Sequence, residues 1–499
     1  MEQKDAEKVL AEYSLNANGM PINVRIAQTA DYVPIYNMSI PGLSDPTKLL
    51  LFSLRGELVA MVTVDTTRIQ DRKYLEEVNR KYIETSSTLI DKYLPATPTE
   101  TKSLLIAYII NMMLGLGDLE APLADDNLEE ITVNGAANMI WVFHKQFGWC
   151  KTNMKLANEE MIYDYAEQIG RRVGREINNL SPLMDAVLPD GSRMNATLYP
   201  VSQVGNTITI RKFAKNPWTM PAMIKNQTVS SEIGAVVWLC IQNEISLLIS
   251  GGTASGKTSL LNSSSIFFPP SHRVVSVEET RELTLPSFLQ WVPMVTRQPN
   301  PEGKGEVTLY DLTINALRQR PDIVVVGEIR VKKDAETLFE AIHTGHAVYG
   351  TVHADNAQDT IVRLTNPPIE VPKIMLNALG AVMVAFRHRN KGIRRILEYG
   401  EVLRSGDVNV LYKWSPRSDS FPQIGDMTRL ADTLMLYSGY TAKEIDDDIV
   451  EKMSILDWMV KNDVVSVDDA GFVVANYYKN KDKVLGIVRD NAAFSRDIF

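Results

Sequence analysis

The sequence predicts an α/β fold whose C-terminal half is a doubly wound domain built on a parallel sheet. Short runs rich in β-branched residues have the composition of buried central strands. Helical patterns lie between these runs, and one of them has Asp334 as its expected N-cap and Gly345 just after its end. Alternation of strands and helices is typical of doubly wound folds. The strands are expected at 245–250, 273–277, 323–326 and 347–351, and the helices from Ser259 onward and at 311–318 and 335–343.

Ahead of this half, residues 101–213 mix helices with strands that alternate polar and apolar residues, so an α+β N-terminal domain is expected. Residues 1–100 form a divergent region, for which strands are expected at 22–26 and 58–64 and a helix at 68–94. The remaining helices are expected at 100–116 and 157–173, and the strands at 130–135, 139–144 and 147–151, with strand-flanked segments at 188–198 and 207–213.

Prolines and a helical tail set the other expected boundaries. Pro217 and Pro221 indicate a linker over residues 214–230, which leaves 231–430 for the α/β domain. Beyond it, residues 431–499 are expected to form a small helical subdomain, in which Thr441 and Glu444 have the spacing of a capping box.

The composition is that of an ordinary globular chain of 499 residues, with 45% hydrophobic and 23% charged residues. A net charge of −9 disfavours a general nucleic-acid binder. The apolar stretch Leu104–Leu116 is interrupted by Asn111 and Gly115 and is shorter than the roughly 20 residues of a membrane span. The first residues lack an apolar segment, so we expect no signal peptide, a cytoplasmic chain, and membrane association only through a partner.

The segment GGTASGKT at 251–258 matches the pattern of a phosphate-binding loop, with an apolar strand before it and a helical run after it. In such a loop, backbone N–H groups and a helix N-terminus face the phosphates. Lys257 is expected to bridge the β- and γ-phosphates, and the Thr258 hydroxyl to bind Mg²⁺. The expected nucleotide-binding residues are Gly251, Gly252, Thr253, Ala254, Ser255, Gly256, Lys257, Thr258 and Ser259.

Carboxylates follow two of the expected strands, where a ligand crevice forms in open parallel sheets. Glu328 comes after IVVVG, and Gly327 stands where most phosphate-loop ATPases carry an aspartate, so Glu328 is expected to hold the water shell of Mg²⁺ or to orient the attacking water. The run EETRE at 278–282 follows the strand 273–277, and one of its carboxylates is a candidate to activate water. No guanine-specific N-K-x-D motif is present, which favours ATP.

Histidines cluster around the strand 347–351. His346 and His353 lie at its opposite ends, which argues against a shared metal ion, and His353 is on the crevice side, where it can sense the γ-phosphate. His343 is interpreted as a residue that complements a helix dipole.

Four ordered motifs, GGTASGKT, VEETRE, LRQRPDIVVVGEIR and GHAVYGTVHAD, resemble the Walker A, acidic, Walker B and histidine boxes of the secretion ATPase superfamily. The strings LPDGSRMNATL, ITIRKF, ITVNG and VFHKQFGW are similar to archaeal members, in particular the archaellum motor ATPase and archaeal type IV pilus assembly ATPases. The resemblance covers roughly residues 120–405, and it makes Gly327 an expected feature of the family.

The resemblance implies a RecA-like P-loop domain, a hexameric ring, and ATP hydrolysis with Mg²⁺ coupled to domain movement. Glu282 would polarise the attacking water and Glu328 would organise Mg²⁺, while His346 and His353 would form the histidine box. Arg193 and Arg211 are candidates for arginine fingers from the N-terminal domain. Glu279 stands where the family usually has Asp, so the division of roles between Glu279 and Glu282 stays open.

The implied partners are a polytopic membrane platform protein, pilin- or archaellin-like filament machinery and accessory motor proteins, with no nucleic acid. The leading hypothesis is a hexameric motor of the archaellum or an archaeal pilus, peripheral at the inner face of the membrane. Two alternatives stay open: an ATPase of a protein or DNA export system, and a scaffold that binds ATP without turnover. Residues 1–100 are expected to choose the partner.

Overall fold

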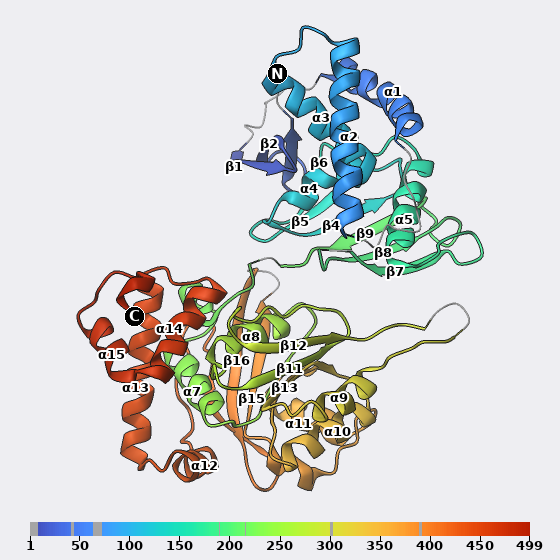
Figure 1. Ribbon diagram of the computed structural model, residues 1–499. Helices are drawn as coiled ribbons and strands as arrows, with labels where there is room; N and C mark the ends of the chain where they lie inside the picture. The colour runs from blue at the N-terminus through green and yellow to red at the C-terminus, as the bar shows by residue number, and fades with distance from the viewer. Residues whose placement is uncertain are drawn as a thin grey trace. The chain divides into compact units, whose positions relative to one another are not determined.

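The computed structural model describes residues 8–40, 44–62, 72–188, 190–214, 216–299, 303–388 and 392–499. The chain divides into two compact units, Met1–Lys215 and Asn216–Phe499, and each has its own sheet and its own core (Figure 1). Each unit is described below by itself.

The first unit is built on a mixed sheet of nine strands in the order β1-β2-β3-β6-β5-β4-β9-β8-β7. All neighbours are antiparallel except β3 and β6, where Ile35 pairs with Lys151. The first hundred residues therefore share a sheet with the rest of this unit. The strands are Lys8–Ala17 (β1), Met20–Gln28 (β2), Ile35–Ser39 (β3), Leu128–Asn134 (β4), Trp141–His144 (β5), Gly148–Thr152 (β6), Leu183–Val187 (β7), Arg193–Thr197 (β8) and Thr207–Arg211 (β9).

Helices cover the buried face of this sheet and contribute leucines, isoleucines and tyrosines to its core. Two tyrosines, Tyr13 and Tyr36, donate hydrogen bonds to the same oxygen of Asp125 (2.6 and 2.5 Å), which ties β1 and β3 to the segment before β4. The helices are Asp45–Met61 (α1), Arg72–Tyr93 (α2), Thr99–Leu114 (α3), Glu120–Ala124 (α4) and Glu159–Val173 (α5).

The strand expected at 58–64 is wrong where the structure describes it, because Leu58 lies inside α1. Ser44 caps this helix by accepting a hydrogen bond from the Thr47 N–H, and Leu51, Leu54 and Leu58 bury one face at helical spacing. Residues 63 and 64 lie outside the described residues, as do residues 68–71 of the helix expected at 68–94.

The second unit is built on an eight-stranded sheet in the order β12-β11-β13-β14-β10-β15-β16-β17. The six strands from β12 to β15 are parallel, and β16 and β17 join antiparallel. The strands are Leu247–Gly251 (β10), Arg273–Glu278 (β11), Gln290–Val295 (β12), Ile323–Ile329 (β13), Ala347–Val352 (β14), Ala381–His388 (β15), Ile393–Val402 (β16) and Val408–Lys413 (β17).

Central strands of this sheet are buried on both faces; every residue of β10 and β14 is buried. This happens because helices cover both faces of a doubly wound sheet, so side chains that point to either side are withdrawn from water. The helices are Met220–Lys225 (α6), Ser231–Gln242 (α7), Lys257–Ser264 (α8), Leu309–Leu317 (α9), Lys332–His343 (α10) and Ala357–Thr365 (α11).

Two expected boundaries in this unit are wrong. Asp334 is not the N-cap of α10: the cap is Val331, and Asp334 lies in the first turn, where its carboxylate accepts a hydrogen bond from the Val331 N–H. The linker expected at 214–230 also extends too far, since α6 lies within it and buries Met220 and Met223 in the core of the second unit. By contrast, Gly345 follows α10 with a φ of 93°, as expected.

A helical tail, Arg429–Ser438 (α12), Ala442–Lys461 (α13), Val467–Lys479 (α14) and Lys481–Arg489 (α15), packs on α7. The expected capping box of Thr441 and Glu444 is present at the start of α13. The fully buried Lys452 donates hydrogen bonds to Asp448 (2.5 Å) and to the hydroxyl of Tyr477 (3.1 Å). These contacts join α13 to α14 within the tail.

Among the described residues, no single helix is long and apolar enough to cross a membrane. One bent pair of segments, Thr99–Met113 and Gly117–Ala124, passes the same test by length and composition only.

Candidate phosphate-binding site

Four strands of the second sheet end at the same edge, and each is followed by one of the sequence motifs. The loop 251–256 follows β10, the acidic run follows β11, Glu328 lies near the end of β13, and His353 follows β14. Since β10, β11, β13 and β14 are parallel neighbours within one sheet, their carboxyl ends converge. The structure therefore brings the four sequence motifs together at this edge of the sheet.

The loop between β10 and α8 has the backbone that phosphate binding needs. Gly251, Ala254 and Gly256 have φ values of 152°, 58° and 99°, so two of these positions suit glycine. A Cβ at Gly251 would lie 2.5 Å from the Ala385 carbonyl oxygen and 2.5 Å from the Ser255 hydroxyl oxygen. The Ser255 hydroxyl is buried and has no hydrogen-bond partner, which leaves a polar group directed into a close-packed cradle.

Lys257 begins α8, and its ammonium group lies between the loop and the acidic residues. Its Nζ donates a hydrogen bond to the Gly252 carbonyl oxygen (3.3 Å) and is 4.0 Å from Oε1 of Glu328. Burial lowers the pKa of Lys257 from its usual value, and the nearby Glu328 carboxylate opposes this. A half-buried cation with one distant carboxylate can take an anionic phosphate as its partner.

Glu328 is placed by an irregularity in β13. The pairing with β14 shifts its register between Val326 and Ile329, so Gly327 and Glu328 leave the regular ladder. Such a bulge re-aims a side chain at the end of a strand. The Gly327 carbonyl oxygen accepts a hydrogen bond from the Thr351 hydroxyl (2.5 Å), which fixes the bulge to β14.

In the acidic run, Glu278 and Glu279 have different surroundings. Glu278 is buried, and its Oε1 accepts hydrogen bonds from the N–H groups of Glu282 (2.8 Å) and Leu283 (3.1 Å), while Oε2 has no partner. Burial raises the pKa of the Glu278 carboxyl to about 7. Both oxygens of Glu279 accept hydrogen bonds from Nη1 of Arg330 at 2.7 Å. The run is therefore a folded loop whose first carboxylate holds it in shape.

The two residues expected in a histidine box do not lie together. His353 Nε2 is 3.1 Å from the Thr253 hydroxyl oxygen, so it contacts the phosphate-binding loop. His346 is at the other end of β14, where its Nδ1 is 3.2 Å from the Ala341 carbonyl oxygen. His343 ends α10, with Nδ1 2.8 Å from the Phe339 carbonyl oxygen. Of these histidines, the structure brings His353 alone to the crevice edge.

Arg193 and Arg211 both belong to the first unit. They are direct partners in the antiparallel pair β8 and β9, and Arg211 is in turn opposite Glu130 of β4. Opposed residues in such a pair project from the same face of the sheet. The two arginines are therefore one charged group on the outer face of the first sheet.

Sequence reasoning passed over residues that also contact this edge. A Cβ at Gly252 would lie 3.2 Å from Oδ1 of Asp355, and Nε of Arg394 is 3.4 Å from the Ala254 carbonyl oxygen. Arg330 stood within a quoted motif without an assigned role, and Glu278 was one of the carboxylates among which the candidate to activate water was left open. Asp355 and Arg394 become visible only when the sheet order places the segments after β14 and at the start of β16 beside the loop.

The residues at this edge fit a nucleotide phosphate and Mg²⁺. The loop offers strained glycine positions, the unpartnered Ser255 hydroxyl and the half-buried Lys257. Thr258 and Glu328 supply oxygen donors, the ligands that Mg²⁺ prefers, and Mg²⁺ in such sites is completed by the phosphates of the substrate.

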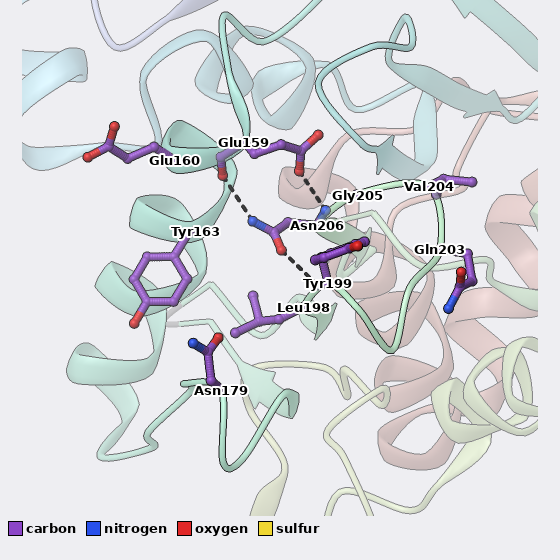
Figure 2. Close-up of a pocket in the computed structure, with 10 residues that line it drawn as sticks. All are labelled: Glu159, Glu160, Tyr163, Asn179, Leu198, Tyr199, Gln203, Val204, Gly205 and Asn206. Atoms are coloured by element: carbon purple, nitrogen blue, oxygen red, sulfur yellow. Dashed lines mark hydrogen bonds between the residues drawn. The ribbon is translucent and has the colours of Figure 1, made fainter.

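A separate hollow of about 530 Å³ lies in the first unit, beside the start of α5. Figure 2 shows Glu159 reaching the segment 198–206, where its Oε2 accepts a hydrogen bond from the Asn206 N–H (2.6 Å). Its Oε1 accepts one from the Ala136 N–H (2.6 Å). The carboxylate therefore serves to hold two loops of the first unit together.

A parallel sheet with a glycine-rich loop between β10 and α8 defines the second unit as a RecA-like P-loop domain. Residues 118–387 match the family model described as "Type II/IV secretion system protein", which is more than half of the chain. The chain therefore belongs to this family, the secretion ATPase superfamily that the four motifs indicated.

Relatives come from archaea and bacteria. The chain is 34% identical over 402 residues to the uncharacterized protein MJ0900 of Methanocaldococcus jannaschii, covering 78% of this chain and 72% of that protein. It is 32% identical over 285 residues to a putative conjugal transfer protein of Mycobacterium tuberculosis, covering 55% of this chain and 77% of that protein.

Solved structures of similar fold include the ATPase DotB of Legionella pneumophila, with 18% identity, a TM-score of 0.44, and coverage of 73% of this chain and 95% of that chain. The pilus retraction motor PilT with bound ADP has 16% identity, a TM-score of 0.40, and coverage of 71% and 95%.

Proposed function

We propose that this protein is an ATPase that hydrolyses ATP to ADP and phosphate and couples the reaction to mechanical work. The observation that carries the proposal is the position of Lys257 at the start of α8, with its Nζ 4.0 Å from the Glu328 carboxylate across the phosphate-binding loop. Phosphoryl transfer needs a cation that binds the phosphates and a carboxylate that acts on Mg²⁺ or on the attacking water. Lys257 and Glu328 bring these two charges close together. Membership of the secretion ATPase superfamily supports it.

In this proposal, the loop residues 251–259 bind the triphosphate, and Lys257 bridges the β- and γ-phosphates. Mg²⁺, when bound, neutralises charge on the phosphate oxygens; Thr258 would hold it directly and Glu328 through water. Glu282 polarises the attacking water, and His353, which contacts Thr253, reports the state of the γ-phosphate to β14. The position of His346 at the far end of β14 supports a structural role for that residue.

Completion of the site requires charge from another unit, for which Arg193 and Arg211 are the candidates. They lie side by side on the outer face of the first sheet, so one movement of that unit would deliver both. A division of the second unit into a motor domain at 231–430 and a helical subdomain at 431–499 is part of the same proposal. Movement of the first unit against the motor domain would then accompany each turnover.

The assembly we propose is a homohexamer in the cytoplasm, bound to the inner face of the membrane through a polytopic platform protein. Its output would be assembly or rotation of an archaeal type IV pilus-like filament, including the archaellum, with accessory motor proteins as further partners. The similarity to MJ0900, an uncharacterized protein of an archaeon, and the archaeal character of the N-terminal motifs support the archaeal part of this proposal.

A second candidate is the ATPase of a protein or DNA export system. The similarity to a putative conjugal transfer protein favours it, and the family description covers it. The two candidates differ in what stimulates turnover. ATPase activity that rises with vesicles carrying the platform protein supports the filament motor, whereas activity that rises with single-stranded DNA at equal salt contradicts it.

Nucleotide binding tests the proposed role of Lys257. The variant Lys257→Ala should bind ATP-Mg²⁺ much more weakly by calorimetry, because the half-buried ammonium that faces the phosphates is gone. Lys225→Ala is the control, since Lys225 makes an exposed ion pair with Asp463 (2.7 Å) away from the loop. Equal ATP affinity in Lys257→Ala and the control would contradict phosphate bridging.

A further inference from the structure

Arg330 joins two carboxylates that come from neighbouring strands. Its Nη1 donates to both oxygens of Glu279 at 2.7 Å, and its Nε and Nη2 donate to Oε2 of Glu328 at 3.0 and 2.7 Å. Glu279 follows β11 and Glu328 lies near the end of β13, and these strands are parallel neighbours. One guanidinium therefore links the acidic run to the glutamate that faces Lys257.

This geometry uses the properties that distinguish arginine from lysine. A planar guanidinium presents several N–H donors in a fixed fork, so it can hold two carboxylates in set directions. Without a cation between them, two carboxylates at one strand edge repel each other and spread apart. The network leaves Oε1 of Glu328 directed toward Lys257, at 4.0 Å, because Oε2 is taken by Arg330.

We propose that Arg330 and Glu279 form a positioning pair that sets the orientation of the Glu328 carboxylate during ATP hydrolysis. Arg330 acts through Glu328, and Glu279 acts through Arg330. The inference rests on the proposed ATPase function and deepens it. It explains why Glu279 is distinct from Glu282: both Glu279 oxygens are engaged by the guanidinium, and the water-polarising role in the acidic run falls to Glu282.

The contact with Arg330 also explains why position 279 has a glutamate and not an aspartate. The family usually has the shorter aspartate there, whereas this chain has a glutamate that reaches a bidentate contact with Arg330 from the loop after β11. The pair is partly exposed, with 55% of the Arg330 side chain and 44% of the Glu279 side chain accessible. Exposed ion pairs add little to stability, so the expected effect of breaking it is on turnover and not on folding.

The test is a double-mutant cycle on steady-state ATP hydrolysis with Arg330→Ala, Glu279→Gln and the double variant. Arg330→Ala should lower kcat about 10-fold to 100-fold, the usual effect of removing a residue that orients a catalytic group, with KM for ATP nearly unchanged. Glu279→Gln should lower kcat less, and the double variant should match Arg330→Ala alone. Arg330→Lys should recover part of the rate, because the ammonium keeps the positive charge. The recovery should be incomplete, because an ammonium cannot bridge both carboxylates as a fork.

Several results would overturn the inference. A further loss of kcat when Glu279→Gln is added to Arg330→Ala would mean that Glu279 acts on the water itself. A raised KM with kcat intact would make Arg330 a phosphate ligand. Unchanged kinetics in every variant would remove the pair from catalysis. If Arg330→Ala does not fold, judged by its thermal transition, Arg330→Lys and Glu279→Gln complete the test.

A matched control comes from the C-terminal tail. Arg496 also donates through Nε and Nη2 to a carboxylate, Asp469 at 2.9 and 2.7 Å, and its side chain is 57% exposed. Arg496→Ala should leave kcat and KM at wild-type values. Wild-type protein without ATP turnover would refute the proposed function, whereas active wild type with active Arg330→Ala would refute this inference alone.

Discussion

The two sheets of this protein are built differently. In the second unit, β10 and β14 are buried at every position, because helices cover both faces of a parallel sheet. In the first unit, β7 alternates exposed and buried residues, and the outer face of this sheet carries Arg193 of β8 and Arg211 of β9. The second sheet thus serves as a rigid platform for the phosphate-binding loop, and the first presents a polar face that can meet a partner.

This difference indicates a division of labour. Lys257, Glu278 and Glu328 all belong to the second unit, where strand ends fix them relative to one another. The arginine candidates belong to the first unit, so their contribution depends on where that unit lies. In the proposed function, this dependence is what would tie the chemical step to movement.

The largest effect is expected from the outer face of the first sheet. If Arg193 or Arg211 completes the site, its replacement by Ala should lower ATP turnover by roughly 10³-fold, the typical contribution of an arginine finger. Thermal stability should change little, since Arg193 is half-exposed and Arg211 is exposed. Phosphate release by each single variant measures this. Wild-type turnover in both would assign the completing charge elsewhere and break the proposed division.

Substitutions to alanine at neighbouring strand positions should lower stability in a different pattern in the two sheets. Leu248 and Ile249, neighbours in β10, are both fully buried, so each change to Ala should cost about 2–5 kcal/mol. In β9, Ile208→Ala should cost a similar amount, while the partly exposed Thr209→Ala should cost under about 1 kcal/mol. Hydrogen exchange resolved by segment measures this. Equal losses of stability in Ile208→Ala and Thr209→Ala would contradict the inference that the first sheet is buried on one face only.

A smaller effect concerns the buried carboxyl of Glu278, whose pKa is raised to about 7 by burial. A raised carboxyl pKa means that the folded state binds a proton more tightly, so stability falls as pH rises from about 4.5 through 7. The cost of the ionised form is about 3 kcal/mol at most. Glu278→Gln removes this titration while it keeps an acceptor for the loop.

The measurement is thermal unfolding of wild type and Glu278→Gln at pH 5 and pH 8. The gain in stability of Glu278→Gln over wild type should be larger at pH 8 than at pH 5. Parallel pH dependence in the two proteins would show that Glu278 is not the buried titrating group. Glu306→Gln, a change at an exposed glutamate, is the control.

Four of the six parallel strands, β10, β11, β13 and β14, could be predicted from sequence within three residues, because burial on both faces leaves a run rich in β-branched residues, whereas β12 and β15 were not expected. Leu58 was misassigned since short apolar runs fit a strand as well as a helix, and the cap at Ser44 that decides the matter is 14 positions earlier. Asp334 was placed at the wrong position because aspartate is favoured both at the N-cap, where its carboxylate accepts from the N–H of the third helical residue, and at the third helical position, where it accepts from the N-cap N–H.

The residues of the candidate site also divide into those that the sequence predicts and those that only the structure reveals. Spacing within two separate motifs was enough to predict Lys257 and Glu328 as site residues. The link from Glu279 to Arg330 joins residues 51 positions apart, and the burial of Glu278 depends on its strand neighbours. Glu278 and Glu279 look alike in sequence, and packing alone separates the buried carboxylate of Glu278 from that of Glu279, which Arg330 holds.

Multiple-turnover phosphate release by wild type and Glu328→Gln, with ATP and Mg²⁺, tests the central claim most directly. The account predicts steady turnover in wild type and a loss of turnover in Glu328→Gln with ATP binding retained, because the amide keeps the shape of the side chain but removes the charge that acts on Mg²⁺ or water. Full turnover in Glu328→Gln, or none in wild type, would contradict it.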